Sequence, residues 1–174
     1  MAHRLELSVH NVADTVNAVS HFQMFLDSLY SFYSRSPKNQ SEIKSISYEL
    51  GDVFLSIGRV FDVRWCFSSF RAIRALWVNF PALMKHLESC VLDSSRNSKE
   101  RSKCSGLIKK MSSWCFVAQM AMLKDCLRVV KDLSLYFQRD SANIVDSSNK
   151  IELAVKLLGA MKDKNGKSFS AFVT

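Results

Sequence analysis

One short segment of the sequence combines the kinds of side chain that contact nucleic acids. Residues 62–87 read DVRWCFSSFRAIRALWVNFPALMKHL, in which Arg64, Arg71 and Arg74 alternate with aromatic residues. Arginine neutralises phosphate groups, and a ring such as that of Trp65 stacks on an unpaired base, a contact worth about 1–3 kcal/mol. We therefore take these four residues as candidate DNA contacts. The alternative is that Trp65, at the start of a helical pattern, belongs to the core.

A second basic segment, DSSRNSKERSKCSG, occupies residues 93–106 and has almost no apolar residues. This composition predicts a flexible, solvated loop. Its candidate DNA contacts are Arg96, Lys99, Arg101 and Lys103, and such phosphate contacts weaken steeply as salt is added. The alternative is a mobile surface linker that its charge keeps soluble, and we favour this alternative over DNA contact.

The histidines and cysteines do not form a catalytic or metal-binding motif. The four histidines (His3, His10, His21 and His86) include no pair four residues apart and no HExxH, and the cysteines include no CxxC pair. A zinc site contained in one segment normally uses such spacings. The sequence also lacks a glycine-rich phosphate loop and a GxSxG nucleophile turn. We therefore expect no catalytic residue, no metal, no cofactor and no small-molecule substrate.

The composition favours a helical domain with acidic partners. The 174 residues fit one domain, and 48% of them are apolar, with only five Gly and two Pro to form turns. The net charge of +8 points to nucleic acid, an anionic surface or acidic proteins. The five cysteines, an odd number, indicate reduced thiols in a cytosolic or nuclear protein. No secretory signal is recognisable, and no segment approaches the ~18 apolar residues of a membrane span.

Apolar residues recur at steps of three and four, which predicts helices along most of the chain. The expected helices run from Leu5 to Tyr33, from Ser41 to Ile57, from Phe70 to Phe80, from Pro81 to Val91, from Trp114 to Phe137 and from Ile144 to Met161. A helix of about 30 residues is ~45 Å long. We therefore expect an all-α domain over residues 1–174, built as an elongated bundle of long antiparallel helices.

Three segments, in this order, resemble the hAT superfamily of DNA transposases and the host proteins descended from them. HRLELSV, at residues 3–9, is similar to the end of the family's CxxH-RLELA element. RWCFSSFRAIRALWVNFPALMKHL resembles the RW-x-S segment and the proline-alanine-leucine helix after it. Residues 123–151 resemble the L-x-x-L-S-x-x-x-Q-x-D helix pair that follows. Together the segments cover nearly the whole chain.

The resemblance implies the helical insertion domain that interrupts an RNase H-like core in this family. Two of the family's three metal-binding carboxylates would lie before His3 and the third beyond Thr174, so strand cleavage has no acidic residue here. His3 corresponds to the histidine of the CxxH element. Arg64 and Trp65 correspond to the pair that lies near the cleaved DNA end.

We therefore expect a non-catalytic, nuclear fragment of a larger hAT-derived protein, with a helical scaffold or DNA-contacting role. The alternative is a protein-interaction module of a domesticated nuclear regulator, similar to a group described as SUMO ligases. A stand-alone nuclease is the weakest hypothesis. We also expect exposed apolar helix faces that bind protein partners or a second copy, and no membrane partner.

Overall fold

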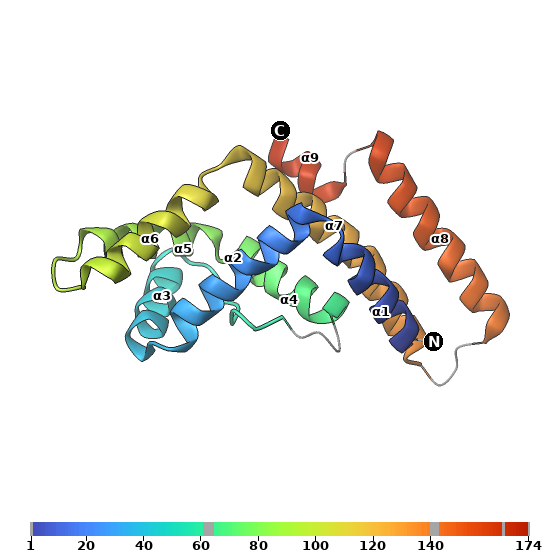
Figure 1. Ribbon diagram of the computed structural model, residues 1–174, viewed down its shortest axis with the longest axis horizontal. Helices are drawn as coiled ribbons and strands as arrows, with labels where there is room; N and C mark the ends of the chain where they lie inside the picture. Colours follow the sequence, from blue (N-terminus) through green and yellow to red (C-terminus); the bar gives the residue numbers. More distant parts are fainter. Residues whose placement is uncertain (1, 61–64, 140–142, 165, 174) are drawn as a thin grey trace.

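The computed structural model describes residues 2–60, 65–139, 143–164 and 166–173 (Figure 1). Every regular element in these ranges is a helix, so the all-α prediction is confirmed. The helices are α1 (Ala2–Asp14), α2 (Asn17–Ser34), α3 (Pro37–Glu49), α4 (Trp65–Val78), α5 (Phe80–Leu92), α6 (Ser98–Met111), α7 (Trp114–Phe137), α8 (Ile144–Asp163) and α9 (Lys167–Val173). None of these described helices has both the length and the apolar character that crossing a bilayer requires.

The single helix predicted from Leu5 to Tyr33 is wrong, because the chain divides it into α1 and α2. The Thr15 hydroxyl donates to the Val12 carbonyl at 2.7 Å, and Val16 has an extended backbone with φ −102° and ψ 101°. Both Thr15 and Val16 are β-branched, which lowers helix propensity. Val12 and Val16 continue the apolar spacing across the break, yet they are 65% and 43% exposed. The apolar spacing therefore continues through a turn whose valines do not pack in the core, so it could not indicate the break.

The helix predicted from Ser41 begins earlier, at Pro37. The Ser36 hydroxyl caps α3 by accepting the Asn39 backbone N–H at 3.2 Å, and the proline occupies the first turn, where its missing N–H costs nothing. The helix ends at Glu49, and Gly51 then adopts φ 73°, the left-handed conformation that favours glycine. The predicted continuation to Ile57 is wrong, because residues 52–60 have no regular secondary structure.

The flexible loop predicted over residues 93–106 is also wrong for most of its length. Helix α6 begins at Ser98, and the Asn97 side chain caps it by accepting the Glu100 backbone N–H at 2.8 Å. A narrow apolar stripe of Cys104, Leu107 and Met111 is buried where α6 packs on α5. Three apolar residues at helical spacing therefore outweigh the polar composition that predicted disorder.

The other helices agree better with the predictions. Pro81 lies in the first turn of α5, helix α7 has the predicted ends, and α8 contains the predicted range from Ile144 to Met161. The sequence pattern did not indicate the short helix α9. Figure 1 shows α7 in the middle of the molecule, the α5–α6 pair at one end and α8 at the other.

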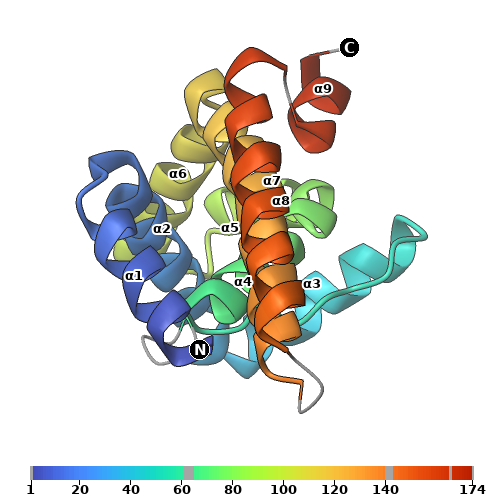
Figure 2. The ribbon, with the colours of Figure 1, turned by 90° about the vertical axis from the view of Figure 1, so that its right-hand side faces the viewer.

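The core lies where α2, α4, α5 and α7 meet, whereas α8 contributes little to it. The largest fully buried apolar side chains of these four helices are Phe25, Leu29, Ile73, Leu76, Leu83, Leu87 and Met120. Helix α8 buries only Ser147 and Ala154 and packs mainly along α7. Figure 2 shows α8 lying outside α7, so it covers the molecule without entering its centre.

One buried carboxylate joins three helices. Glu6 of α1 is only 5% exposed. Its Oε2 accepts the Cys66 backbone N–H at 2.8 Å, in the first turn of α4, and its Oε1 accepts the Ser134 hydroxyl of α7, also at 2.8 Å. A carboxylate in this position accepts a hydrogen bond from an amide that has no partner within the helix, and the positive end of the helix dipole stabilises its negative charge. Glu6 therefore fixes the start of α4 relative to α1 and α7.

We expect Glu6→Gln to lower the free energy of unfolding by about 1–3 kcal/mol, because an amide cannot accept both hydrogen bonds through its two ends. Urea denaturation followed by circular dichroism measures this loss. Glu88→Gln, at an exposed position on α5, is the matched control and should change stability by less than about 0.5 kcal/mol. Equal, small losses in both variants would contradict the role of Glu6.

Candidate functional site

The first group of predicted DNA contacts is divided by the structure. Arg64 lies outside the described residues. Trp65 is 4% exposed, and its ring stacks on that of His10 with the centroids 5.8 Å apart. Trp65 is therefore a core residue and offers no free ring face to a base. His3 is exposed on α1, whereas Arg71 and Arg74 are exposed on α4.

The second group includes one residue that faces the interior. Arg96 is 7% exposed, and its guanidinium binds Glu42, Glu100 and Asn39 inside the protein. Arg96 is therefore not available to a phosphate group, and its assignment as a DNA contact is wrong. The other three candidates lie on α6, with Lys99 exposed and Arg101 and Lys103 half-buried.

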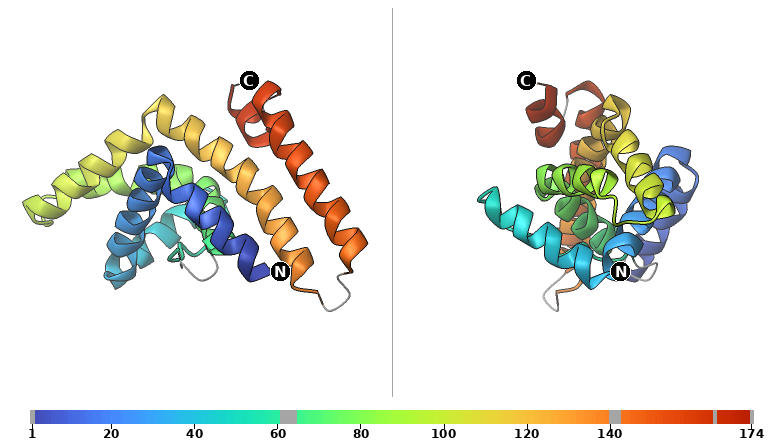
Figure 3. Two further views of the ribbon diagram at one scale, coloured as in Figure 1. Left: turned by 45° about the vertical axis from the view of Figure 1, so that its right-hand side comes forward. Right: turned by 90° about the vertical axis from the view of Figure 1, so that its left-hand side faces the viewer.

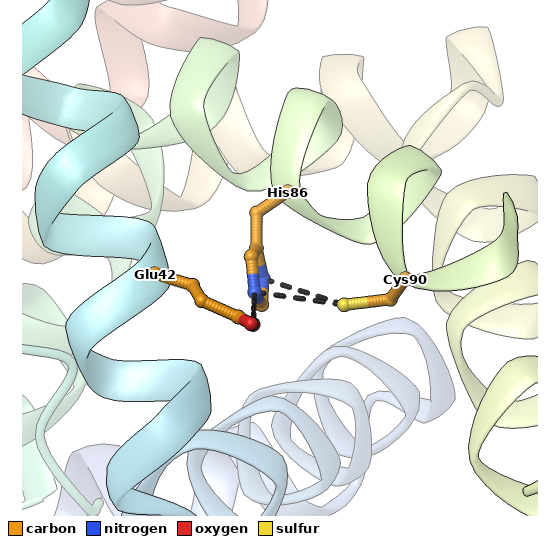
Figure 4. Close-up of side chains that lie close together, drawn as sticks. All are labelled: Glu42, His86 and Cys90. Atoms are coloured by element: carbon orange, nitrogen blue, oxygen red, sulfur yellow. Dashed lines mark hydrogen bonds and ion pairs between the residues drawn. The ribbon is translucent and has the colours of Figure 1, made fainter. Parts of the chain in front are cut away.

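Arg96 belongs to a buried polar cluster between α3, α5 and α6, part of which is drawn in Figure 4. His86 is central to it: its Nε2 lies 3.0 Å from Glu42 Oε2, and its Nδ1 lies 2.8 Å from the Tyr33 hydroxyl. The sulfur of Cys90 lies 3.5 Å from Nε2 and 3.9 Å from Nδ1. With Tyr33 of α2, the cluster thus connects four helices through side chains that are far apart in the sequence.

The cluster shifts the pKa values of its members in opposite directions. Burial disfavours the charged form of Glu42, but the hydrogen bond with His86 and the charge of Arg96 outweigh it and lower the pKa of this carboxyl. Burial likewise opposes the charged form of His86, but the contacts with Cys90 and Glu42 prevail and raise the pKa of the imidazole. A hydrogen bond with Cys104, together with burial, raises the pKa of the Cys90 thiol.

Glutamate, histidine and cysteine are ligands that zinc accepts, and the donor atoms of Glu42, His86 and Cys90 lie within 4.8 Å of one another. Two features oppose a metal site. The carboxylate already pairs with Arg96, whose charge repels a divalent cation, and the sulfur lies beside the imidazole ring, almost equally far from both nitrogens. The hydrogen bond with Cys104 and burial raise the pKa of Cys90, which disfavours a thiolate at this position. We therefore interpret the cluster as a structural feature that holds the packed helices together.

A different set of charged residues lies on the outside, along α4 and α7. The Nζ atom of Lys124 lies 4.2 Å from the ring centroid of Trp77, and that of Lys131 lies 4.6 Å from the ring centroid of Phe70. Residue numbers rise along α7 as they fall along α4, so the two helices are antiparallel. Each lysine makes a cation–π contact across the helix pair.

Three arginines accompany these lysines. Arg71 and Arg74 are exposed on α4, and Arg128 is exposed on α7, one turn after Lys124. Burial and the charges of Arg128 and Arg74 lower the pKa of Lys124, which places the three cations close together. The five residues Arg71, Arg74, Lys124, Arg128 and Lys131 are named the basic ladder.

The nearby acidic residues leave the basic ladder with excess positive charge. The Oδ2 atom of Asp125 accepts the backbone N–H groups of Ser168 at 2.8 Å and Phe169 at 3.3 Å, and the charge of Asp125 acts on Lys124 against those of Arg128 and Arg74. Asp132 pairs with Lys131 at 2.9 Å and is exposed. The remaining cations of the basic ladder can therefore attract an anionic partner.

Arg71 and Arg74 were predicted from the sequence as DNA contacts, whereas the three cations of α7 were not. Their spacing of four and then three residues, within a helix whose ends were predicted, was a usable signal that they share one face. Their position beside α4 was not visible, because it depends on how the two helices pack. For the buried cluster, the spacing of His86 and Cys90 was visible, whereas their pairing with Glu42 was not.

Comparison with known proteins does not identify the chain. No family model matches the sequence, and no solved structure matches the fold. The functional interpretation therefore depends on the geometry of the basic ladder and on the sequence segments that resemble hAT proteins.

We expect Glu42→Gln to lower stability most between about pH 4.5 and 6.5, the ordinary pKa values of Glu and His. The lowered pKa of Glu42 stabilises the fold above the ordinary value and loses this effect as the pH falls through the folded pKa. The raised pKa of His86 stabilises the fold below its ordinary value and loses this effect as the pH rises through the folded pKa. Urea denaturation across this range, repeated on both sides of it, measures the difference.

The matched control for this experiment is Glu49→Gln on the same helix. Glu49 pairs with Lys85 at 3.1 Å, and both side chains are more than half exposed. Exposed pairs contribute little to stability, so this variant should follow the wild type at every pH. A difference between wild type and Glu42→Gln that does not vary with pH would contradict the ionised Glu42–His86 pair.

Proposed function

We propose that this chain is a non-catalytic helical module of hAT-transposase descent that contacts DNA through the basic ladder. The observation that carries the proposal is the group of cations along the α4–α7 pair, where Arg74 and Arg128 act on Lys124, Lys131 crosses to Phe70, and the exposed Arg71 lies one turn before Arg74. The resemblance of the sequence to hAT proteins supports it, because two of these cations lie in the segment that is similar to the family's RW-x-S region. The non-catalytic role rests on the sequence motifs, which include no metal-binding spacing, phosphate loop or nucleophile turn.

The basic ladder fits the DNA backbone better than the bases. The exposed side chains of Arg71, Arg74 and Arg128 can each meet a phosphate group, whereas Lys124 donates to the Ser168 hydroxyl and Lys131 pairs with Asp132. The rings of Phe70 and Trp77 are covered by these lysines, so they are not free to stack on bases. We therefore infer binding that depends on charge and is weakly selective for sequence.

The proposal includes the features that the family resemblance implies. The antiparallel α4–α7 pair and the neighbouring α7–α8 pair are compatible with an elongated antiparallel bundle of the kind expected for a helical insertion domain. As part of a larger parent protein in the nucleus, such a module would hold DNA and position it, while any chemistry would belong to other residues.

A second candidate function, protein interaction, is favoured by a separate observation on α8. Apolar residues of this helix are largely exposed: Ile144 78%, Val145 71%, Ile151 44%, Leu153 49%, Val155 63% and Leu157 46%. Leu153 and Leu157 lie on one side of the helix and Ile151 and Val155 on another, and exposed apolar side chains in this number are typical of interaction sites. This observation supports the alternative of an interaction module in a nuclear regulator.

We expect the double variant Arg74→Glu/Arg128→Glu to weaken binding of a fluorescent DNA duplex by roughly tenfold or more, measured by anisotropy at low salt. Each phosphate contact that is lost should also reduce the slope of log K against log salt by about 0.9. Both side chains are exposed, so circular dichroism should show an unchanged fold.

A charge-matched control variant is Lys99→Glu/Arg101→Glu on α6, which makes the same change in net charge at residues that sequence analysis also selected. This variant should weaken binding much less than the α4–α7 variant. Equal losses in the two variants would show that only net charge matters and would contradict the basic ladder. Binding that does not respond to salt would contradict a phosphate-contacting surface altogether.

A further inference from the structure

The two long helices at one end of the molecule do not close on each other. Helices α7 and α8 run side by side (Figure 3), and a groove of about 600 Å³ lies between them. Val129 and Leu133 line it from α7, and Leu153 and Leu157 line it from α8. The two leucines of α8 are 49% and 46% exposed. The floor of the groove is therefore apolar and open.

The rim of this groove is basic. Four cations line it, namely Arg128 from α7, Arg139 just after the end of α7, Lys150 from α8 and Lys167 from α9. Asp125 and Asp132 line it too, but the first accepts two backbone N–H groups of α9 and the second pairs with Lys131. The rim therefore retains a positive charge around the apolar floor.

We propose that this groove binds an acidic amphipathic helix of a partner protein. An apolar floor between two helices accepts side chains at i, i+3 or i+4 and i+7 of a third helix, the common helix-in-groove arrangement. The lining residues of α8 run from Lys150 to Met161, about 17 Å, which matches about three helical turns. Acidic residues on both sides of the apolar row would meet the basic rim.

Charge and apolar surface together favour this partner over a second copy of the chain and over a nucleic acid. A second copy would bring its own net charge of +8 to a basic rim, which opposes association. A nucleic-acid backbone would satisfy the rim but would cover the leucines of the floor with charged phosphates, leaving their apolar surface without a matching partner. The groove therefore differs from the basic ladder in the partner that it fits, although Arg128 belongs to both.

The test uses the full chain and a labelled synthetic peptide of about 18 residues, helical by design, with leucine at the heptad a and d positions and glutamate beside them. Fluorescence anisotropy should show saturable binding, and the same peptide with lysine in place of glutamate should bind at least about tenfold more weakly. Leu157→Asp should reduce affinity for the acidic peptide at least about tenfold. Val145→Asp, at a 71% exposed position of α8 outside the groove, should leave it unchanged.

The remaining outcomes each decide the question. Equal peptide binding by wild type and Leu157→Asp would overturn the proposal. A dimer in sedimentation that Leu157→Asp dissociates, or loss of duplex binding in that variant, would assign the groove to a second copy or to DNA instead. Arg139→Glu/Lys150→Glu, which changes two exposed residues, repeats the test if Leu157→Asp does not fold. Unchanged DNA affinity in Leu157→Asp separates this proposal from the basic ladder.

Discussion

The antiparallel packing of α4 against α7 determines most of what this chain presents to solvent. Ile73, Leu76 and Met120 are buried on the inner faces of these helices, so their polar faces emerge together and bring the cations of both helices side by side. Repulsion between two exposed charges about 4 Å apart costs about 1 kcal/mol in water, whereas burial of one large aliphatic side chain contributes about 1.5–3 kcal/mol. Apolar packing therefore outweighs the repulsion between like charges and keeps the cations of the two helices close together.

Burial, and not residue type, decides what each arginine does. Arg96 lies inside the protein, where its acidic partners compensate the loss of water, and breaking such a buried group apart is costly. Arg74 and Arg128, which lie in amphipathic helices, are exposed, whereas Arg96 is buried although it comes from a segment with almost no apolar residues. The same side chain thus stabilises three helices in one place and attracts an anionic partner in another.

The sequence pattern predicted the helices whose apolar stripes are complete, and it failed where tertiary packing decides. Helix α7 was predictable because its buried positions continue at helical spacing for its whole length. The break at Thr15 could not be predicted because Val12 and Val16 continue the apolar spacing although they are not buried. Helix α6 could not be predicted because only three buried apolar residues pack it against the rest of the protein. Arg71 and Arg74 could be selected from sequence, but the pairing of Glu42 with His86, 44 residues away, requires the fold.

Helix α8 shows how the open groove and the stability of the chain are connected. It buries only Ser147 and Ala154, although helices in proteins take most of their stability from tertiary packing. The cap that Asn143 provides by accepting the Asp146 backbone N–H at 2.8 Å contributes about 1 kcal/mol, and the exposed Glu152–Lys156 pair adds less. Because local terms are this small, α8 depends on its packing along α7, and a partner that covers Leu153 and Leu157 would stabilise this helix further.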